Sequence, residues 1–365
     1  MKVGIIGLPN VGKSTIFNAL TASDIPANNY PFCTIEPNIG IVPVPDARLS
    51  QINQFIKTNK ILSTVIEFVD IAGLVKGASK GEGLGNKFLS HIRNVDAIVH
   101  VVRAFENNDI THVEGNIDPL RDIQIIETEL LLKDLEKLNN RLEKIKKLNK
   151  TGDKLATQET KLLEKAIIEL NNGNLLNHFD CTKADQSIIK SWFLLTDKPM
   201  IYLCNIDEKM LQNEQKLNCY SNIQKYAINK QNHCLIICGS IEMEISKITE
   251  DSDKKDFLEM YNLSRSGLDK LITLAYKQLG LITFFTAGEQ EIRAWTITSE
   301  TYAPQAAGAI HTDFERGFIK AEIYHIDDLI QYQSELILRE KGKIRQEGKE
   351  YIVQDGDIIF FKFNV

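Results

Sequence analysis

Gly7-Leu8-Pro9-Asn10-Val11-Gly12-Lys13-Ser14-Thr15 matches the pattern G-x-x-x-x-G-K-[ST], and this stretch decides the fold. A β-branched run, Val3 to Ile6, precedes it, and an amphipathic run, Ile16 to Leu20, follows it. Strand, loop and helix therefore stand in the order that phosphate binding needs, because the loop N–H groups and the helix N-terminus then face the phosphate oxygens. The sequence predicts an α/β nucleotide-binding domain.

The chemistry of the loop assigns a role to each part. Glycine at both ends lets the loop wrap closely around a phosphate chain. We expect Lys13 to be catalytic, since its charge can reach the β- and γ-phosphates, and we expect the Ser14 hydroxyl to ligate Mg²⁺. Asn10 is also a candidate ligand for K⁺ beside the phosphates. The predicted nucleotide contacts here are Asn10, Val11, Gly12, Lys13, Ser14 and Thr15.

A second carboxylate-bearing motif follows the strand Val65 to Asp70. Asp70 opens a D-x-x-G sequence that ends at Gly73, and we expect its carboxylate to act on Mg²⁺ through water. The Gly73 N–H can approach the γ-phosphate because no side chain obstructs it. Thr34 lies at a spacing suited to completing the Mg²⁺ shell, with a simple capping threonine as the alternative. The predicted metal ligands are Ser14, Thr34 and Asp70.

Length and composition set broader limits. A chain of 365 residues predicts two or three domains. With 43% hydrophobic and 25% charged residues, the chain is neither collagen-like nor largely disordered. We find no apolar run long enough for a membrane helix and no secretory signal, and six scattered cysteines favour reduced thiols, so we predict a cytoplasmic protein without membrane contact.

The middle of the chain has a different composition. From about 120 to 199 it is rich in Leu, Lys, Glu and Asn, and leucines recur at coiled-coil spacing from Leu131 to Ile145. After a break near Gly152, Leu155, Leu162, Ala166 and Leu170 continue a helical pattern. This predicts an inserted antiparallel helical hairpin, with a helical segment of the same core as the alternative.

From about Leu281 the pattern changes to alternating, half-buried strands, with helices expected at Asp313 to Phe318 and Ile326 to Leu338. We therefore predict a small C-terminal α+β domain. The full division is a nucleotide-binding domain over 1–119 and 200–280, a helical insert over 120–199, and a C-terminal domain over 281–365.

These motifs together resemble a known family. Residues 7–15, 29–38 and 70–86 are similar to the Obg-related GTPases, and more narrowly to the YchF or Obg-like ATPase branch. The resemblance continues through C-terminal motifs at 284–288, 293–296, 303–308 and 311–315, whereas the insert matches in placement only. It implies a Ras-like P-loop NTPase domain, an inserted coiled-coil hairpin and a C-terminal TGS domain of β-grasp type. It also implies a ribosome or ribosomal subunit as partner.

Base recognition departs from the guanine pattern N-K-x-D, because Asn205-Ile206-Asp207-Glu208 follows the strand Met200 to Cys204. Ile206 replaces the lysine that packs on the base, and Glu208 is longer than the usual aspartate. Unpaired recognition groups cost about 1 to 3 kcal/mol each. We therefore expect ATP to be preferred, with backbone groups near Ile206 meeting adenine and Asn205 serving as a scaffold or base contact. The predicted nucleotide contacts in this segment are Asn205, Ile206 and Glu208. The resemblance implies the same preference. A one-residue slip that uses Asp207 would leave guanine or mixed specificity.

Water activation also departs from the Ras pattern. The position of the water-orienting glutamine is Leu74, so hydrolysis needs another group or an activating partner. His112 is the candidate, since an imidazole can orient or deprotonate water, and the alternative is a solvated loop histidine. We interpret His91 and His100 as structural. Cys33 lies beside Thr34, so its oxidation would distort Mg²⁺ binding, unless it is a passive small residue.

The partner predictions rest on local charge. The net charge of −6 gives no global nucleic-acid footprint, but Lys133 to Lys165 holds ten Lys/Arg and six Asp/Glu, a balance of 10 − 6 = +4. This is either a solvated face or a surface for RNA or a ribosomal protein. Neither it nor Arg339 to Arg345 interleaves aromatic residues, so we expect any RNA contact to be to the backbone.

Two functions compete on these grounds: an ATP-hydrolysing switch stimulated by the ribosome, and a nucleotide-sensing binding protein whose hydrolysis is incidental. A metabolic kinase fits less well, because no acceptor pocket is evident in the sequence. We expect a monomer.

Overall fold

The computed structural model describes all residues except 23–37, 72–83, 106–116, 149–152, 212–217 and 365. Contacts divide the chain into two compact units. The first contains Met1–Val42 and Glu67–Leu268, and the second contains Pro43–Ile66 and Asp269–Val365. Residues 43–66 thus group with the C-terminal part of the chain. The division into three domains stays a prediction. No helix in the described ranges is both long and apolar enough to cross a membrane.

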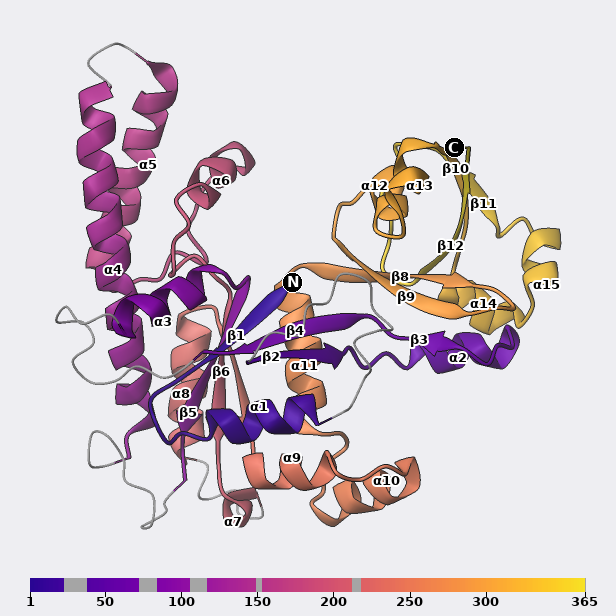
Figure 1. Ribbon diagram of the computed structural model, residues 1–365, viewed down its shortest axis with the longest axis horizontal. Helices are drawn as coiled ribbons and strands as arrows, with labels where there is room; N and C mark the ends of the chain where they lie inside the picture. The colour runs from indigo at the N-terminus through magenta and orange to yellow at the C-terminus, as the bar shows by residue number, and fades with distance from the viewer. Residues whose placement is uncertain (23–37, 72–83, 106–116, 149–152, 212–217, 365) are drawn as a thin grey trace. The chain divides into compact units, whose positions relative to one another are not determined.

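The first unit is built on a six-stranded sheet of order β2-β4-β1-β5-β6-β7 (Figure 1). Its central pairs are parallel, as the β-branched runs predicted. Every residue of β5 and β6 is buried, which explains their continuous apolar sequences. The strands are β1 (Lys2–Ile6), β2 (Ile39–Pro43), β4 (Val65–Asp70), β5 (Ala97–Arg103), β6 (Met200–Asn205) and β7 (His233–Ile237).

Helices cover this sheet through two packed pairs: α1 packs against α9, and α4 packs against α8. Ile16 and Leu20 are buried on α1, as their helical spacing predicted. The helices of this unit outside the hairpin region are α1 (Lys13–Thr21), α3 (Leu84–Arg93), α7 (Glu208–Leu211), α8 (Asn218–Asn229), α9 (Gly239–Ile245) and α10 (Asp251–Met260). The next helix, α11 (Gly267–Gln278), begins at the end of this unit and lies mostly in the second.

The predicted helical hairpin is present as α4 (Pro119–Leu148) and α5 (Lys154–Asn171), which lie side by side (Figure 1). Asp153 caps α5, because its side chain accepts from the Leu155 N–H at 2.9 Å. Arg141 pairs with Glu159 at 2.5 Å and Lys146 with Glu164 at 2.9 Å, so part of the positive charge is neutralised inside the hairpin.

Of the apolar residues in the helical pattern of α5, Leu155 is not buried. Leu155 is 70% exposed, whereas Ala156 and Leu163 are buried. Leu155 is only the second residue of α5. Helix ends fray and their boundaries shift by one or two residues, so helical spacing is a poor guide to burial there. Beyond α5, a short helix α6 (Lys183–Lys190) begins with a capping box formed by Thr182 and Asp185.

The second unit contains another six-stranded sheet, of order β11-β10-β12-β8-β9-β3. Adjacent phenylalanines on β8 enter different cores: Phe284 packs with Ile323 and Phe361, and Phe285 packs with Leu329. The strands are β3 (Ile61–Leu62), β8 (Leu281–Ala287), β9 (Ile292–Thr298), β10 (Phe318–His325), β11 (Arg345–Glu347) and β12 (Asp357–Phe363). The helices are α2 (Arg48–Phe55), α12 (Ala303–Gly308), α13 (Thr312–Arg316), α14 (Ile326–Tyr332) and α15 (Glu335–Glu340).

The expected single helix from Ile326 to Leu338 was wrong, because the structure has two helices there, α14 and α15. Gln333 between them has φ 59°, a left-handed conformation, and its N–H donates to the Leu329 carbonyl at 2.8 Å. The helix expected to reach Phe318 also ends earlier, at Arg316, and Phe318 begins β10.

The loop before β6 contains a carboxylate whose protonation affects stability. Burial raises the pKa of Asp197 from 3.8 to about 6, and Lys198 opposes this rise. Because the folded-state pKa lies above the unfolded value, ionised Asp197 destabilises the fold as pH rises from 4 through 6. We predict that Asp197→Asn is more stable than the wild type by about 1 to 2 kcal/mol at pH 7.5 and equally stable at pH 4.

Urea unfolding at the two pH values measures this difference. Asp180→Asn, an exposed carboxylate in the same unit, serves as the control and should shift stability by less than about 0.5 kcal/mol. Equal stability of Asp197→Asn and wild type at both pH values would contradict the prediction.

Candidate nucleotide site

The predicted phosphate loop joins β1 to α1 and has the backbone of an anion-binding turn. Asn10 and Gly12 have φ of 63° and 98°, both in the left-handed region. A side chain at Gly12 would collide with the Asn205 amide, and one at Gly7 would place its Cβ 2.5 Å from the Val101 carbonyl oxygen. Both glycines of the motif are therefore required by close packing as well as by the turn.

Lys13 begins α1 and is buried, with only 9% of its surface exposed. Its Nζ donates to the Gly7 carbonyl at 3.0 Å and to the Leu8 carbonyl at 2.8 Å. Burial lowers the pKa of Lys13, and the Asp70 carboxylate opposes this effect. The lysine is thus held against its own loop, at the position where the motif requires its charge.

Asp70 ends β4, next to Ile5 of β1 in the parallel register. Its Oδ1 is buried and has no hydrogen-bond partner among the described residues. Burial raises the pKa of this carboxyl, and Lys13 opposes the rise. An unpartnered buried carboxylate oxygen fits a metal or its water, since Mg²⁺ prefers oxygen ligands. The exposed Ser14 hydroxyl supplies a second oxygen at the start of α1.

Asn205, at the end of β6, ties the phosphate loop to a second loop. Its Nδ2 donates to the Val11 carbonyl at 3.0 Å, and its Oδ1 accepts from the Gly239 N–H at 3.0 Å. Both ends of the buried amide are therefore bonded to backbone, which fits the scaffold role, and Asn205 also lines the pocket described next.

A pocket of about 580 Å³ opens in front of the loop. It brings together residues that follow four separate strands of the sheet, at the edge where ligands bind in parallel α/β folds. The lining residues are Asn10, Gly12, Lys13, Ser14, Thr15, Phe105, Asn205, Ile206, Asp207, Gly239 and Ser240. We call this the nucleotide pocket.

The structure places only part of the base-recognition segment in the nucleotide pocket. Asp207 lines the nucleotide pocket, whereas Glu208 does not; Glu208 begins α7 and accepts from the Tyr261 hydroxyl at 3.0 Å. Asp207 Oδ1 accepts from the Met210 N–H at 2.8 Å. The Ile206 N–H donates to the Ile237 carbonyl at 2.8 Å, so this backbone donor is already used.

Three lining residues were missed by the sequence analysis: Phe105, Gly239 and Ser240. Phe105 follows β5, and the Arg103 guanidinium lies 4.7 Å above its ring and donates from Nε to its carbonyl at 3.2 Å. Gly239 and Ser240 follow β7. The available signal was their position just after the apolar runs that form β5 and β7, since the carboxyl ends of parallel strands meet at one edge.

Several predicted residues lie outside the described residues: Thr34, Gly73, Leu74, His112 and Cys33. The two histidines interpreted as structural are described in part. His91 lies on α3. His100 lies in β5 with 1% of its surface exposed, and burial lowers its pKa to about 3, so it is a neutral core residue.

The double hydrogen bond of Asn205 gives a testable prediction. Asn205→Ala leaves the Val11 carbonyl and the Gly239 N–H without their partner, so we expect a loss of about 2 to 3 kcal/mol in unfolding free energy. We also expect roughly tenfold weaker nucleotide binding, because the phosphate loop loses its anchor. A tenfold change corresponds to a loss of about 1.4 kcal/mol in binding free energy.

Urea unfolding and titration with a fluorescent ATP analogue measure both effects. Asn171→Ala, which removes an exposed amide that donates to the Ile167 carbonyl at 2.9 Å, is the control. If Asn205→Ala binds nucleotide as tightly as Asn171→Ala, the anchor role is wrong.

The fold and this site define a P-loop nucleoside-triphosphate-binding protein. Residues 2–150 match a family model described as a 50S ribosome-binding GTPase, and residues 281–364 match one named YchF-GTPase_C, described as a protein of unknown function. The chain is 48% identical to the ribosome-binding ATPase YchF of Bacillus subtilis and 47% identical to that of Escherichia coli O157:H7, covering 100% of itself and at least 99% of each relative. The chain belongs to the YchF family.

A solved structure agrees with this membership. The YchF GTPase of Schizosaccharomyces pombe is 41% identical, with a TM-score of 0.89 over 99% of this chain and 97% of that chain. The α/β fold class with a P-loop nucleotide domain and a C-terminal YchF domain is thereby confirmed.

Proposed function

We propose that this chain is a Mg²⁺-dependent, ATP-preferring P-loop ATPase that works as a switch on the ribosome. The observation that carries the proposal is a phosphate loop with a buried Lys13, together with an Asp70 oxygen that has no hydrogen-bond partner among the described residues. The base segment of the same site lacks the guanine-reading lysine. The bacterial relatives are named ribosome-binding ATPases, whereas the fission-yeast relative is named a GTPase.

Each part of the site supports a step in hydrolysis. The loop N–H groups bind the phosphate chain, and Lys13 supplies positive charge where negative charge grows in the transition state. Ser14, Asp70 and Thr34 would hold Mg²⁺, which when bound neutralises charge on the phosphate oxygens. Gly73 would contact the γ-phosphate. We further propose that Asn10 contributes to a K⁺ site.

Base selection follows from the pocket wall. Ile206 cannot supply the cation that packs on guanine, and Glu208 is turned to Tyr261 rather than into the nucleotide pocket. We propose that Ile206 and Phe105 enclose the base by apolar contact. Asp207 lines the pocket and is the residue through which GTP could still be accepted, so mixed specificity is the alternative that this geometry favours most.

Water activation explains why a partner is expected. Among the residues that the structure describes, those that line the nucleotide pocket include no glutamine or histidine. We propose that His112 orients the attacking water when a partner docks, and that hydrolysis is slow in the free protein. The ribosome is the proposed partner, and we place the protein in the cytoplasm as a monomer with inserted helical (120–199) and C-terminal TGS (281–365) domains.

Single-turnover ATP hydrolysis with and without ribosomes tests this proposal. We expect stimulation of at least tenfold by ribosomes. An unchanged rate, together with ribosome binding that depends on the nucleotide, would instead support a nucleotide-sensing binding protein whose hydrolysis is incidental.

A further inference from the structure

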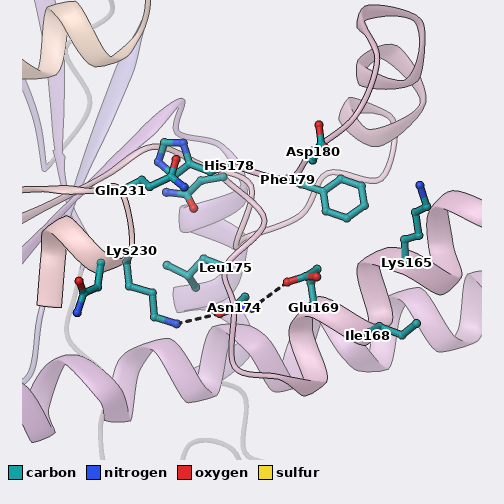
Figure 2. Close-up of a pocket in the computed structure, with 12 residues that line it drawn as sticks. Lys165, Ile168, Glu169, Asn174, Leu175, His178, Phe179, Asp180, Lys230 and Gln231 are labelled. Atoms are coloured by element: carbon teal, nitrogen blue, oxygen red, sulfur yellow. Dashed lines mark hydrogen bonds between the residues drawn. The ribbon is translucent and has the colours of Figure 1, made fainter.

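A second pocket, of about 600 Å³, lies at the base of the hairpin (Figure 2). It is formed by the end of α5, the loop that follows α5, and the turn between α8 and β7. It shares no residue with the nucleotide pocket. We call it the hairpin-base pocket.

The inner wall of the hairpin-base pocket is fixed by hydrogen bonds. Figure 2 shows Asn174 joined to residues on two sides: its Oδ1 accepts from Lys230 Nζ at 3.3 Å, and its Nδ2 donates to Glu169 Oε2 at 2.8 Å. Asn177 Nδ2 donates to Asn232 Oδ1 at 2.6 Å. Because these side chains are already ordered, a ligand would not have to bear the entropy of fixing them.

The Asn177 contact continues into the core. Asn232 Nδ2 donates to the Tyr202 hydroxyl at 3.3 Å, and Tyr202 donates to the buried Glu127 carboxylate on α4. Tyr226 of α8 also donates to Glu127, at 2.6 Å. A buried polar network of this kind holds its members in one arrangement, so the wall of the pocket is preformed.

Other lining groups are available to a ligand. Within the described part of the chain, the side chains of His178, Asn229 and Gln231 have no hydrogen-bond partner, and Lys165 makes no ion pair within 4.0 Å. Phe179 adds a partly exposed aromatic ring. The site therefore combines carboxamides, an imidazole, an aromatic ring and a cation.

This combination fits one unpaired nucleotide of an RNA strand. Unstacked bases stack on aromatic side chains and are read at their edges by polar groups, for which carboxamides are well suited. Lys165 and Lys230 are balanced by Glu169 and Asp180, so the formal charge of the pocket is near zero. That balance suits a base with a single phosphate better than a free polyphosphate.

A protein partner fits the pocket less well. Protein interfaces gain most of their binding energy from apolar or aromatic anchors buried in well-packed pockets. Here the lining is mainly polar, and its apolar members are Ile168, Leu175 and Phe179.

We propose that the hairpin-base pocket binds a splayed-out nucleotide of single-stranded RNA. The proposal rests on the proposed function, because the ribosome would supply such RNA. It adds base contact to the backbone contact expected from the charge of the hairpin.

Fluorescence polarisation of full-length protein with a 5′-fluorescein, 12-nucleotide single-stranded RNA of mixed sequence tests the proposal. We expect Lys165→Gln to weaken binding at least fivefold and to reduce the salt slope by about 0.7, the value for one lost phosphate contact on a single strand. Lys161→Gln, one turn earlier on α5, exposed and outside the pocket, should change binding less than twofold.

A second pair of variants tests the contribution of base stacking to RNA binding without changing the charge of the protein. We expect Phe179→Leu to weaken binding about fivefold or more through lost stacking. Phe193→Leu, which alters a 68% exposed ring outside the pocket, should have little effect. All of these positions are at least partly exposed, and thermal unfolding checks that the variants fold.

Equal weakening by Lys161→Gln and Lys165→Gln would mean that only general charge binds RNA, and would overturn the proposal. No RNA binding by the wild type would also overturn it. If ribosomes still stimulate ATP hydrolysis in that case, the proposed function stands and only the pocket assignment fails; a wild type without ribosome stimulation counts against the proposed function itself.

Discussion

Lys13→Met is expected to reduce ATP hydrolysis about a thousand-fold. Lys13 is buried at the start of α1 with its Nζ on the Gly7 and Leu8 carbonyls, so its charge is already placed before the transition state forms. Removing one preorganised donor to developing charge commonly costs 10² to 10³ in rate. We expect ATP affinity to fall as well, since the β- and γ-phosphates lose the same charge.

The fold should survive this change. The two loop carbonyls lose a partner, at a cost of about 1 to 3 kcal/mol, which is less than the total stability of a typical domain. Circular dichroism and urea unfolding check this point. Lys2→Met, which removes an exposed lysine 3.6 Å from Glu67, is the matched control and should hydrolyse ATP at the wild-type rate. A loss of less than tenfold in Lys13→Met would contradict the role assigned to Lys13.

Asp70→Asn is expected to lower ATP hydrolysis without lowering the stability of the fold. Burial raises the pKa of the Asp70 carboxyl, which means that the charged form is disfavoured in the folded protein, so a neutral amide of the same shape should leave the nucleotide-free protein equally or more stable. The amide is a poor partner for Mg²⁺ or its water. We expect hydrolysis to fall about a hundred-fold and half-saturation to need roughly tenfold more Mg²⁺.

Hydrolysis rates across a Mg²⁺ series and urea unfolding without nucleotide measure the two effects. Glu67→Gln removes a carboxylate from the same strand, away from the carboxyl edge of the sheet, and should leave the Mg²⁺ dependence unchanged. An unchanged Mg²⁺ dependence in Asp70→Asn would show that Asp70 does not act on the metal.

The phosphate end of the site could be predicted from the sequence because one short motif determines it. The positions from Gly7 to Lys13 are adjacent in the chain, so their spacing alone determines the loop. Phe105 and Ser240 could not be found in this way, because they join the pocket only through the pairing of β5, β6 and β7.

At the end of the pocket where we expect the base, a shift of one residue decides which carboxylate lines the wall. β6 ends at Asn205 and α7 begins at Glu208, and this boundary places Asp207 in the pocket and Glu208 outside it. Patterns of hydrophobicity locate element ends only to within a few residues. The sequence therefore could not decide which of the two carboxylates lies at the pocket, and recognition of guanine through Asp207 stays the alternative.

Hydrophobic patterns were also insufficient to predict how the second unit is composed. β3 is only two residues long, Ile61 and Leu62, and it pairs with β9 more than two hundred positions later. A strand this short has no detectable alternation. Its sequence therefore gives no sign that residues 43–66 group with the C-terminal part.

Direct competition between ATP and GTP tests whether the nucleotide pocket prefers ATP. The Mg²⁺-loaded wild type is saturated with a fluorescent ATP analogue, which is then displaced by ATP and by GTP in parallel titrations. We expect ATP to displace the analogue at a concentration at least tenfold lower than GTP. Equal displacement, or displacement at lower concentrations of GTP, would contradict this expectation and would assign base recognition to Asp207.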